Sequence, residues 1–127
     1  MQLNSLRNRF YILLKNKKVY LVYAPLIIYW LILFILTTLP SGSAPDMIKV
    51  SDKLKHFSAY GLLAFLLSLT LHFQDKYDYL RQHNFLITVL IIAFYGFIDE
   101  LHQAFIPGRN CEFLDWIADT LGAIFGV

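Results

Sequence analysis

The stretch FLITVLIIAFYGFIDELHQAFIPGRNCEFLDWIAD, residues 85–119, decides the predicted fold. It consists of two apolar runs separated by a Pro-Gly-Arg turn at residues 107–109. Both runs contain carboxylates, namely Asp99, Glu100, Asp115 and Asp119. Ionisable groups within long apolar helices rarely face lipid, and by default they mark a functional or tightly paired site. We therefore expect the rest of the chain to support this cluster of carboxylates.

The composition is that of a membrane protein. Of the 127 residues, 57% are hydrophobic and only 16% are charged, and the mean hydropathy is +0.54, whereas soluble domains are nearer half apolar and a quarter charged. The length leaves room for one domain. A net charge of +2 without a basic stripe argues against nucleic acid as a partner. The single cysteine, Cys111, excludes an intrachain disulfide and a Cys-based zinc site.

The hydropathy pattern predicts an all-α fold, a polytopic membrane protein with four transmembrane helices in a small bundle. Residues 19–39 contain no charge and are long enough to cross about 30 Å of hydrocarbon as a helix. Further helices are expected at residues 51–73, 85–105 and 112–127, joined by a loop at 39–50 and a polar connection at 74–84. The last helix is short, about 22 Å at the helical rise, so it crosses with little tilt or does not cross completely.

The distribution of basic residues predicts the domain organisation and the orientation. Residues 1–18 form a basic cytoplasmic segment with an apolar patch at 10–14 that suits a membrane surface, and residues 19–127 form the transmembrane domain. Seven of the eleven basic residues lie on one side of the predicted helices, namely Arg7, Arg9, Lys15, Lys17, Lys18, Lys76 and Arg81. The positive-inside rule then places both termini of this multi-pass cell-membrane protein in the cytoplasm. The carboxylate cluster consequently faces outward.

A cleaved signal peptide is the alternative for the first apolar segment. Small residues at 41–44 suit a cleavage site. However, the apolar run from Val19 to Leu39 is longer than the usual core of a signal peptide, which is about 7–15 residues. We therefore expect a retained helix.

Helical spacing aligns the polar residues of three helices into stripes. The stripes, at i, i+4 spacing, are Asp52, His56 and Tyr60; Tyr95, Asp99 and Gln103; and Asp115 and Asp119. One outward-opening pocket shared by three helices would satisfy all of them, because lipid offers no hydrogen-bond partner. The candidate pocket comprises Asp52, Lys53, His56, Tyr60, Asp99, Glu100, Gln103, Arg109, Asp115 and Asp119. In this prediction the Arg109 side chain reaches back from its loop to pair with a carboxylate.

Each group in the pocket also has a simpler interpretation. Polar side chains commonly hold helices of a bundle together by hydrogen bonds, and Asp115 suits the first turn of a helix on electrostatic grounds alone. Lys53 is either an anchor at the membrane surface or a ligand for a phosphate or carboxylate. Gly122 and Gly126 have the spacing that lets a second helix pack closely. We expect no cofactor, with a hard divalent ion on the oxygen and imidazole groups as the alternative.

The ordered set of motifs resembles the VanZ-like membrane proteins. The resemblance rests on four pieces: Asp52-Lys53-x-x-His56-x-x-x-Tyr60; Asp99-Glu100-x-x-Gln103; Pro107-Gly108-Arg109; and Asp115-x-x-x-Asp119-x-x-Gly122. It covers residues 51–127, and the first helix fits by position only. The family usually has Asn at the position of Asp119, so this chain needs a proton, Arg109 or a cation to relieve repulsion between two acids at i, i+4.

The resemblance implies an envelope protein, because the member that gives the family its name is associated with low-level resistance to the lipoglycopeptide teicoplanin. Our first hypothesis is that the pocket binds an amphiphilic envelope ligand. This ligand would be either a lipid-linked wall precursor or the lipid part of a lipoglycopeptide. Membrane lipids are the other expected partners. Here Lys53 and Arg109 would hold an anionic head group. The second hypothesis is a membrane enzyme that acts on a lipid or glycan head group through carboxylate and His56 acid–base chemistry. The third is a purely structural bundle.

Overall fold

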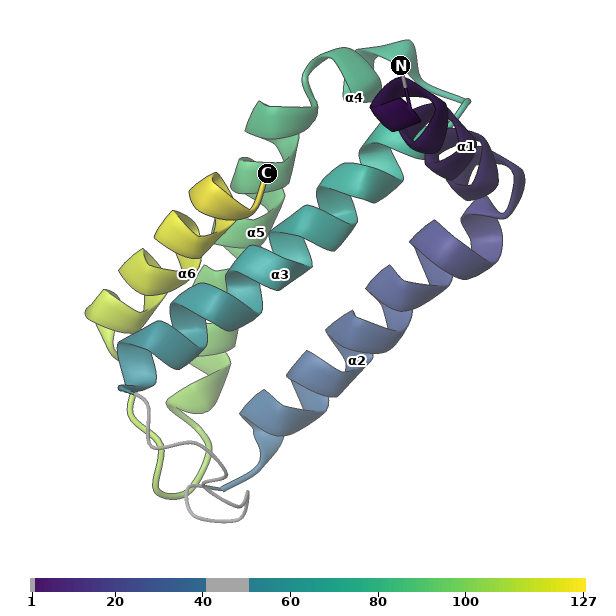
Figure 1. The fold of residues 1–127 in the computed structure, drawn as a ribbon. Helices are drawn as coiled ribbons and strands as arrows, with labels where there is room; N and C mark the ends of the chain where they lie inside the picture. Colours follow the sequence, from purple (N-terminus) through teal and green to yellow (C-terminus); the bar gives the residue numbers. More distant parts are fainter. Residues whose placement is uncertain (1, 41–50) are drawn as a thin grey trace.

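The computed structural model describes residues 2–40 and 51–127, and its regular elements are helices (Figure 1). In chain order these are α1 (Gln2–Asn16), the π-helical turn η1 (Val19–Tyr23), α2 (Ala24–Thr38), α3 (Asp52–Phe73), α4 (Asp78–Gln82), α5 (Asn84–Gln103) and α6 (Phe113–Gly126). Most of the predicted loop at 39–50, including the alternative cleavage site at 41–44, lies outside the described residues.

Within residues 2–40 and 51–127, three helical segments are long enough and apolar enough to cross a membrane. They are Val19–Thr38, Asp52–Phe73 and Asn84–Gln103. Together with the shorter α6 they confirm the predicted helical membrane bundle. Apolar side chains such as Ile28, Leu90 and Phe94 remain more than half exposed, which in a membrane bundle is the surface that meets lipid.

The first membrane-length segment begins with a π-helical turn because of a proline. Pro25 has no N–H and its ring clashes with the carbonyl group four residues before it in a regular helix. The helical turn is wider here, because the N–H of Ala24 donates to the carbonyl of Val19, five residues earlier. Before this turn, α1 lies at the same end of the bundle as α4 (Figure 1), where the Tyr11 ring packs 5.3 Å from that of Phe73.

The helices α3 and α6 run parallel and in close contact through glycines. A Cβ atom at Gly122 would lie less than 3.0 Å from the Phe57 carbonyl oxygen, and one at Gly126 would lie equally close to the carbonyl of Gly61. The predicted packing role of this glycine pair is therefore confirmed. Because Gly61 lies midway along α3, α6 ends at about the middle of its neighbour (Figure 1).

The core lies where α3 packs against α2, α5 and α6. Leu63, Ala64, Ile92 and Ala123 are fully buried in it. Some boundaries differ from the sequence predictions. The helix α5 ends at Gln103, two residues before the predicted end, and the short helix α4 occupies part of the predicted polar connection. After α5 the chain turns at Gly108, whose φ of 76° is readily adopted only by glycine.

Candidate functional site

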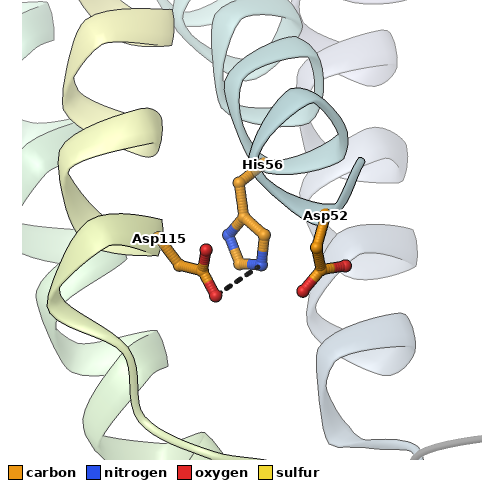
Figure 2. Close-up of side chains that lie close together, drawn as sticks. All are labelled: Asp52, His56 and Asp115. Carbon is orange, nitrogen blue, oxygen red and sulfur yellow. Dashed lines mark ion pairs between the residues drawn. The ribbon is translucent and has the colours of Figure 1, made fainter. Parts of the chain in front are cut away.

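The predicted polar residues meet at the end of the bundle where α3 and α6 begin and α5 ends. Figure 2 shows this end, with Asp52 and His56 on α3 and Asp115 on α6. The parallel course of α3 and α6 brings their first turns side by side, because both helices start from the same end. Residues more than sixty positions apart in sequence therefore come into contact.

His56 lies at the centre of this cluster. Its Nδ1 atom lies 2.9 Å from Oδ1 of Asp119 and 3.9 Å from Oε1 of Glu100, while Nε2 lies 3.8 Å from Oδ2 of Asp115. The three carboxylates are buried, whereas the imidazole is only partly covered. One imidazole thus faces carboxylates from two other helices.

A second network lies deeper in the bundle, around Asp99. The Tyr60 hydroxyl donates to Oδ2 of Asp99 at 2.7 Å, and Nε2 of Gln103 donates to the same oxygen at 3.1 Å. All three side chains are buried. Tyr95, which shares the stripe of Asp99, does not join this network, because its buried hydroxyl has no hydrogen-bond partner among the described residues. Two of the three residues in this stripe, Asp99 and Gln103, therefore meet Tyr60 from the stripe on α3.

Lys53 closes the outer side of the cluster. Its ammonium group pairs with Asp115 and with Glu112, the residue that precedes α6. The same Glu112 donates its backbone N–H to Oε2 of Glu100 at 2.9 Å. The ammonium group holds the pKa of the Glu112 carboxyl below its usual range by hydrogen bonding and charge. Glu112 thus links α3, α5 and α6, a role that the sequence analysis did not assign to it.

Asp52 lies at the rim of the cluster. Two-thirds of its side chain is exposed, and its carboxylate forms an ion pair with Lys55 at 3.9 Å. Together with His56 and Asp115 it forms one of two groups, among the residues that the structure describes, whose ligand atoms are close enough to hold a metal ion. The other group is His56, Glu100 and Asp119. The two groups share the imidazole.

The predicted pairing of Arg109 with a carboxylate is wrong. Its guanidinium donates to the carbonyl oxygens of Leu36 at 2.9 Å and Leu39 at 2.8 Å, and reaches the Gln103 side-chain oxygen at 3.4 Å. A guanidinium group suits this position because the last carbonyl groups of a helix have no partner within the helix and carry partial negative charge. Arg109 fastens the end of α2 to the loop after α5.

An apolar cleft adjoins the polar cluster. It has a volume of about 380 Å³ and is lined by Phe97, Glu100, Leu101, Cys111, Glu112, Phe113 and Trp116. The indole N–H of Trp116 donates to the Ala93 carbonyl at 2.9 Å, which fixes one wall. Only Glu100 of these residues was among the predicted pocket residues. The sequence could have indicated Glu112, because it lies about one turn before Asp115. The apolar residues of the cleft could not have been recognised, because their sequence pattern is the same as that of any lipid-facing helix surface.

The amino-acid sequence matches one known protein family. The family model described as VanZ/LLP1 matches residues 26–127, which include every polar group of the cluster. No curated protein and no solved structure matches the chain. Because the match covers most of the sequence, it confirms the resemblance drawn from the motifs, and the chain belongs to the VanZ/LLP1 family.

Proposed function

We propose that this membrane protein binds an amphiphilic ligand of the cell envelope in the cleft between α5 and α6. The observation that supports this is that the cleft is lined by both apolar and acidic side chains. Phe97 and Phe113 line it together with Glu100 and Glu112. Binding sites for small molecules are commonly apolar with a few polar groups that set orientation. An acyl chain would occupy the apolar part, and the head group would lie against the carboxylates.

The contacts of the basic residues define the head group. Lys53 is already paired with Glu112 and Asp115, and Arg109 is bound to carbonyl oxygens. Neither cation is therefore free to bind an anionic head group, and the charged residues that line the cleft, Glu100 and Glu112, are both acids. An anionic head group is disfavoured for these two reasons. An amine, amide or hydroxyl donor fits instead, and both the peptide of a lipid-linked wall precursor and a teicoplanin-type lipoglycopeptide carry such donors. Capture of the latter would contribute to resistance.

A fluorescence experiment tests the proposal directly. The chain has two tryptophans, so Trp30→Phe leaves Trp116 in the cleft wall as the only indole. We expect a long-chain amine with a brominated chain to quench Trp116 saturably, and a fatty acid with the same chain to do so only weakly, because the carboxylates repel it. Partition into the detergent micelle adds only a non-saturating background. Teicoplanin and a lipid-linked wall precursor are then compared as competitors.

Two further variants provide the control. Cys111→Phe places a large ring in the cleft, whereas Leu90→Phe adds one on the exposed face of α5 outside it. Saturable quenching should disappear in the first and persist in the second. Equal quenching by amine and acid, or its persistence in Cys111→Phe, contradicts the proposal.

Acid–base catalysis on a lipid or glycan head group is the second candidate function. It is favoured by the His56 imidazole, which lies between the carboxylates of Asp115 and Asp119 and remains partly open to the outside of the cluster. A carboxylate that orients an imidazole is the usual arrangement for proton transfer. Mass spectrometry of a lipid-linked wall precursor incubated with purified protein distinguishes the two functions, since a pure binder leaves the precursor unchanged.

A further inference from the structure

Two buried carboxylate oxygens in the cluster lack a hydrogen-bond donor. They are Oε1 of Glu100 and Oδ2 of Asp119, and neither has a hydrogen-bond partner among the described residues. Glu100 is 3% exposed and Asp119 is fully buried. An unpaired carboxylate oxygen away from water is strongly unfavourable. The protein therefore needs a cation or a proton at this point.

The basic side chains nearby do not supply that cation. Lys53 binds Asp115 and Glu112 on the outer side, and Arg109 binds the end of α2. In the part of the chain that the structure describes, His56 is the basic residue that pairs with Glu100 and Asp119. One imidazole cannot carry enough positive charge for two buried carboxylates.

The geometry points to a metal ion, and we propose that His56, Glu100 and Asp119 bind a divalent first-row transition ion. Each residue offers one ligand atom, and these atoms lie within 4.8 Å of one another. Around an ion with bonds of about 2.1 Å, neighbouring ligand atoms are about 3.0–3.4 Å apart. The distances from Nδ1 of His56, 2.9 Å to Asp119 and 3.9 Å to Glu100, lie on either side of this range. Small side-chain rotations would therefore bring the three ligands to coordination distance.

The ligand types define the class of ion. An imidazole with two carboxylates suits Mn²⁺ or Zn²⁺, whereas Mg²⁺ and Ca²⁺ prefer oxygen ligands throughout. The opposite side of the imidazole fits this assignment, because Nε2 faces Asp115 at 3.8 Å. A histidine that binds metal through one nitrogen usually directs the N–H of the other toward a carboxylate, which fixes its tautomer and ring orientation.

The test is the metal content of the purified full-length protein, measured by mass spectrometry after exposure to Mn²⁺ or Zn²⁺ and removal of free ion. We expect stoichiometric metal in the wild type and its loss in Glu100→Gln combined with Asp119→Asn, which preserve side-chain shape. Asp52→Asn is the matched control, because Asp52 belongs only to the other possible group. Retention of metal in this control locates the ion at Glu100 and Asp119.

A second measurement avoids dependence on the folding of the variants. Chelation should lower the thermal unfolding temperature of the wild type, and Mn²⁺ or Zn²⁺ but not Mg²⁺ should restore it, since an ion that binds only the folded state stabilises that state. Wild-type protein that holds no metal and is indifferent to chelator overturns the proposal and leaves a shared proton between the carboxylates. Loss of metal in Asp52→Asn with retention in the double variant overturns it as well. Neither measurement uses a cleft ligand, so the outcome is separate from that of the quenching experiment.

Discussion

Two neighbouring tyrosines, Tyr60 and Tyr95, differ in what their hydroxyl groups contact. The Tyr60 hydroxyl donates to the carboxylate of Asp99 at 2.7 Å, whereas the buried Tyr95 hydroxyl has no partner among the described residues. The two rings lie 5.9 Å apart between centroids. They therefore form a matched pair for measuring the value of one hydrogen bond in the cluster.

We expect Tyr60→Phe to destabilise the protein by about 1.5–3 kcal/mol, the usual contribution of a hydrogen bond to a charged group. Its ring stays in place, so the loss reports the hydroxyl alone. Tyr95→Phe should be neutral or slightly stabilising, because it removes a buried polar atom that is unpaired. Thermal unfolding in detergent, followed by circular dichroism, measures both. Equal destabilisation by the two substitutions would show that packing, and not the bond to Asp99, determines the effect.

At the scale of elements, the contact between α3 and α6 determines the geometry of the cluster. Glycines at positions 61, 122 and 126 let the two backbones approach, and this approach places His56 within 2.9 Å of Asp119. The helix α6 is shorter than the membrane-length helices, so its position depends on this packing. Close contact between backbones is how small residues associate helices in lipid, where the hydrophobic effect gives no driving force between them.

We expect Gly122→Ala to destabilise the bundle by about 1–3 kcal/mol, the cost of an extra methyl group in a close-packed contact. The new Cβ would meet the Phe57 carbonyl within 3.0 Å, and a helix backbone cannot move aside. Gly61→Ala is the graded control, because its Cβ would stand 3.1 Å from the Gly122 carbonyl oxygen and requires a smaller shift. Thermal unfolding should rank the two variants in that order. A more stable Gly122→Ala protein would mean that helix propensity outweighs the contact.

At the scale of the whole molecule, the two ends of the bundle differ in charge. One end carries the basic α1 and the polar connection that contains α4, and at the other end α3 and α6 begin (Figure 1). The carboxylate cluster and the cleft lie at this second end. The positive-inside rule predicts that the cluster faces the outside of the cell. A wall precursor or an external antimicrobial could then reach the cleft from that side.

Cysteine labelling in cells tests this orientation, because Cys111 is exposed and lies at the cluster end. A membrane-impermeant maleimide should label it in intact cells. The matched control is Cys111→Ser combined with Tyr79→Cys, since Tyr79 is exposed in α4 at the opposite end. This variant should be labelled only after permeabilisation. The reverse pattern would invert the topology and favour a substrate in the cytoplasmic leaflet.

The sequence by itself determined the class of fold and the residues that each helix contributes to the cluster. Apolar runs of this length form helices in a membrane, because a helix satisfies its own backbone hydrogen bonds. The ends of α3 and α5 were predicted to within two residues. Spacing of i, i+4 likewise placed Asp52 with His56, and Asp115 with Asp119, on one face of their helices. These are local properties, and no knowledge of neighbouring helices is needed to infer them.

The tertiary structure alone decided which groups meet. The sequence analysis paired Arg109 with a carboxylate, but the guanidinium binds the carbonyl groups at the end of α2. It also gave no role to Glu112, which contacts both Lys53 and Glu100. Contacts between helices depend on how each is rotated and shifted against the next, and that arrangement follows from side-chain shape and from where glycines permit close approach. Spacing along one helix carries no information about the register of another.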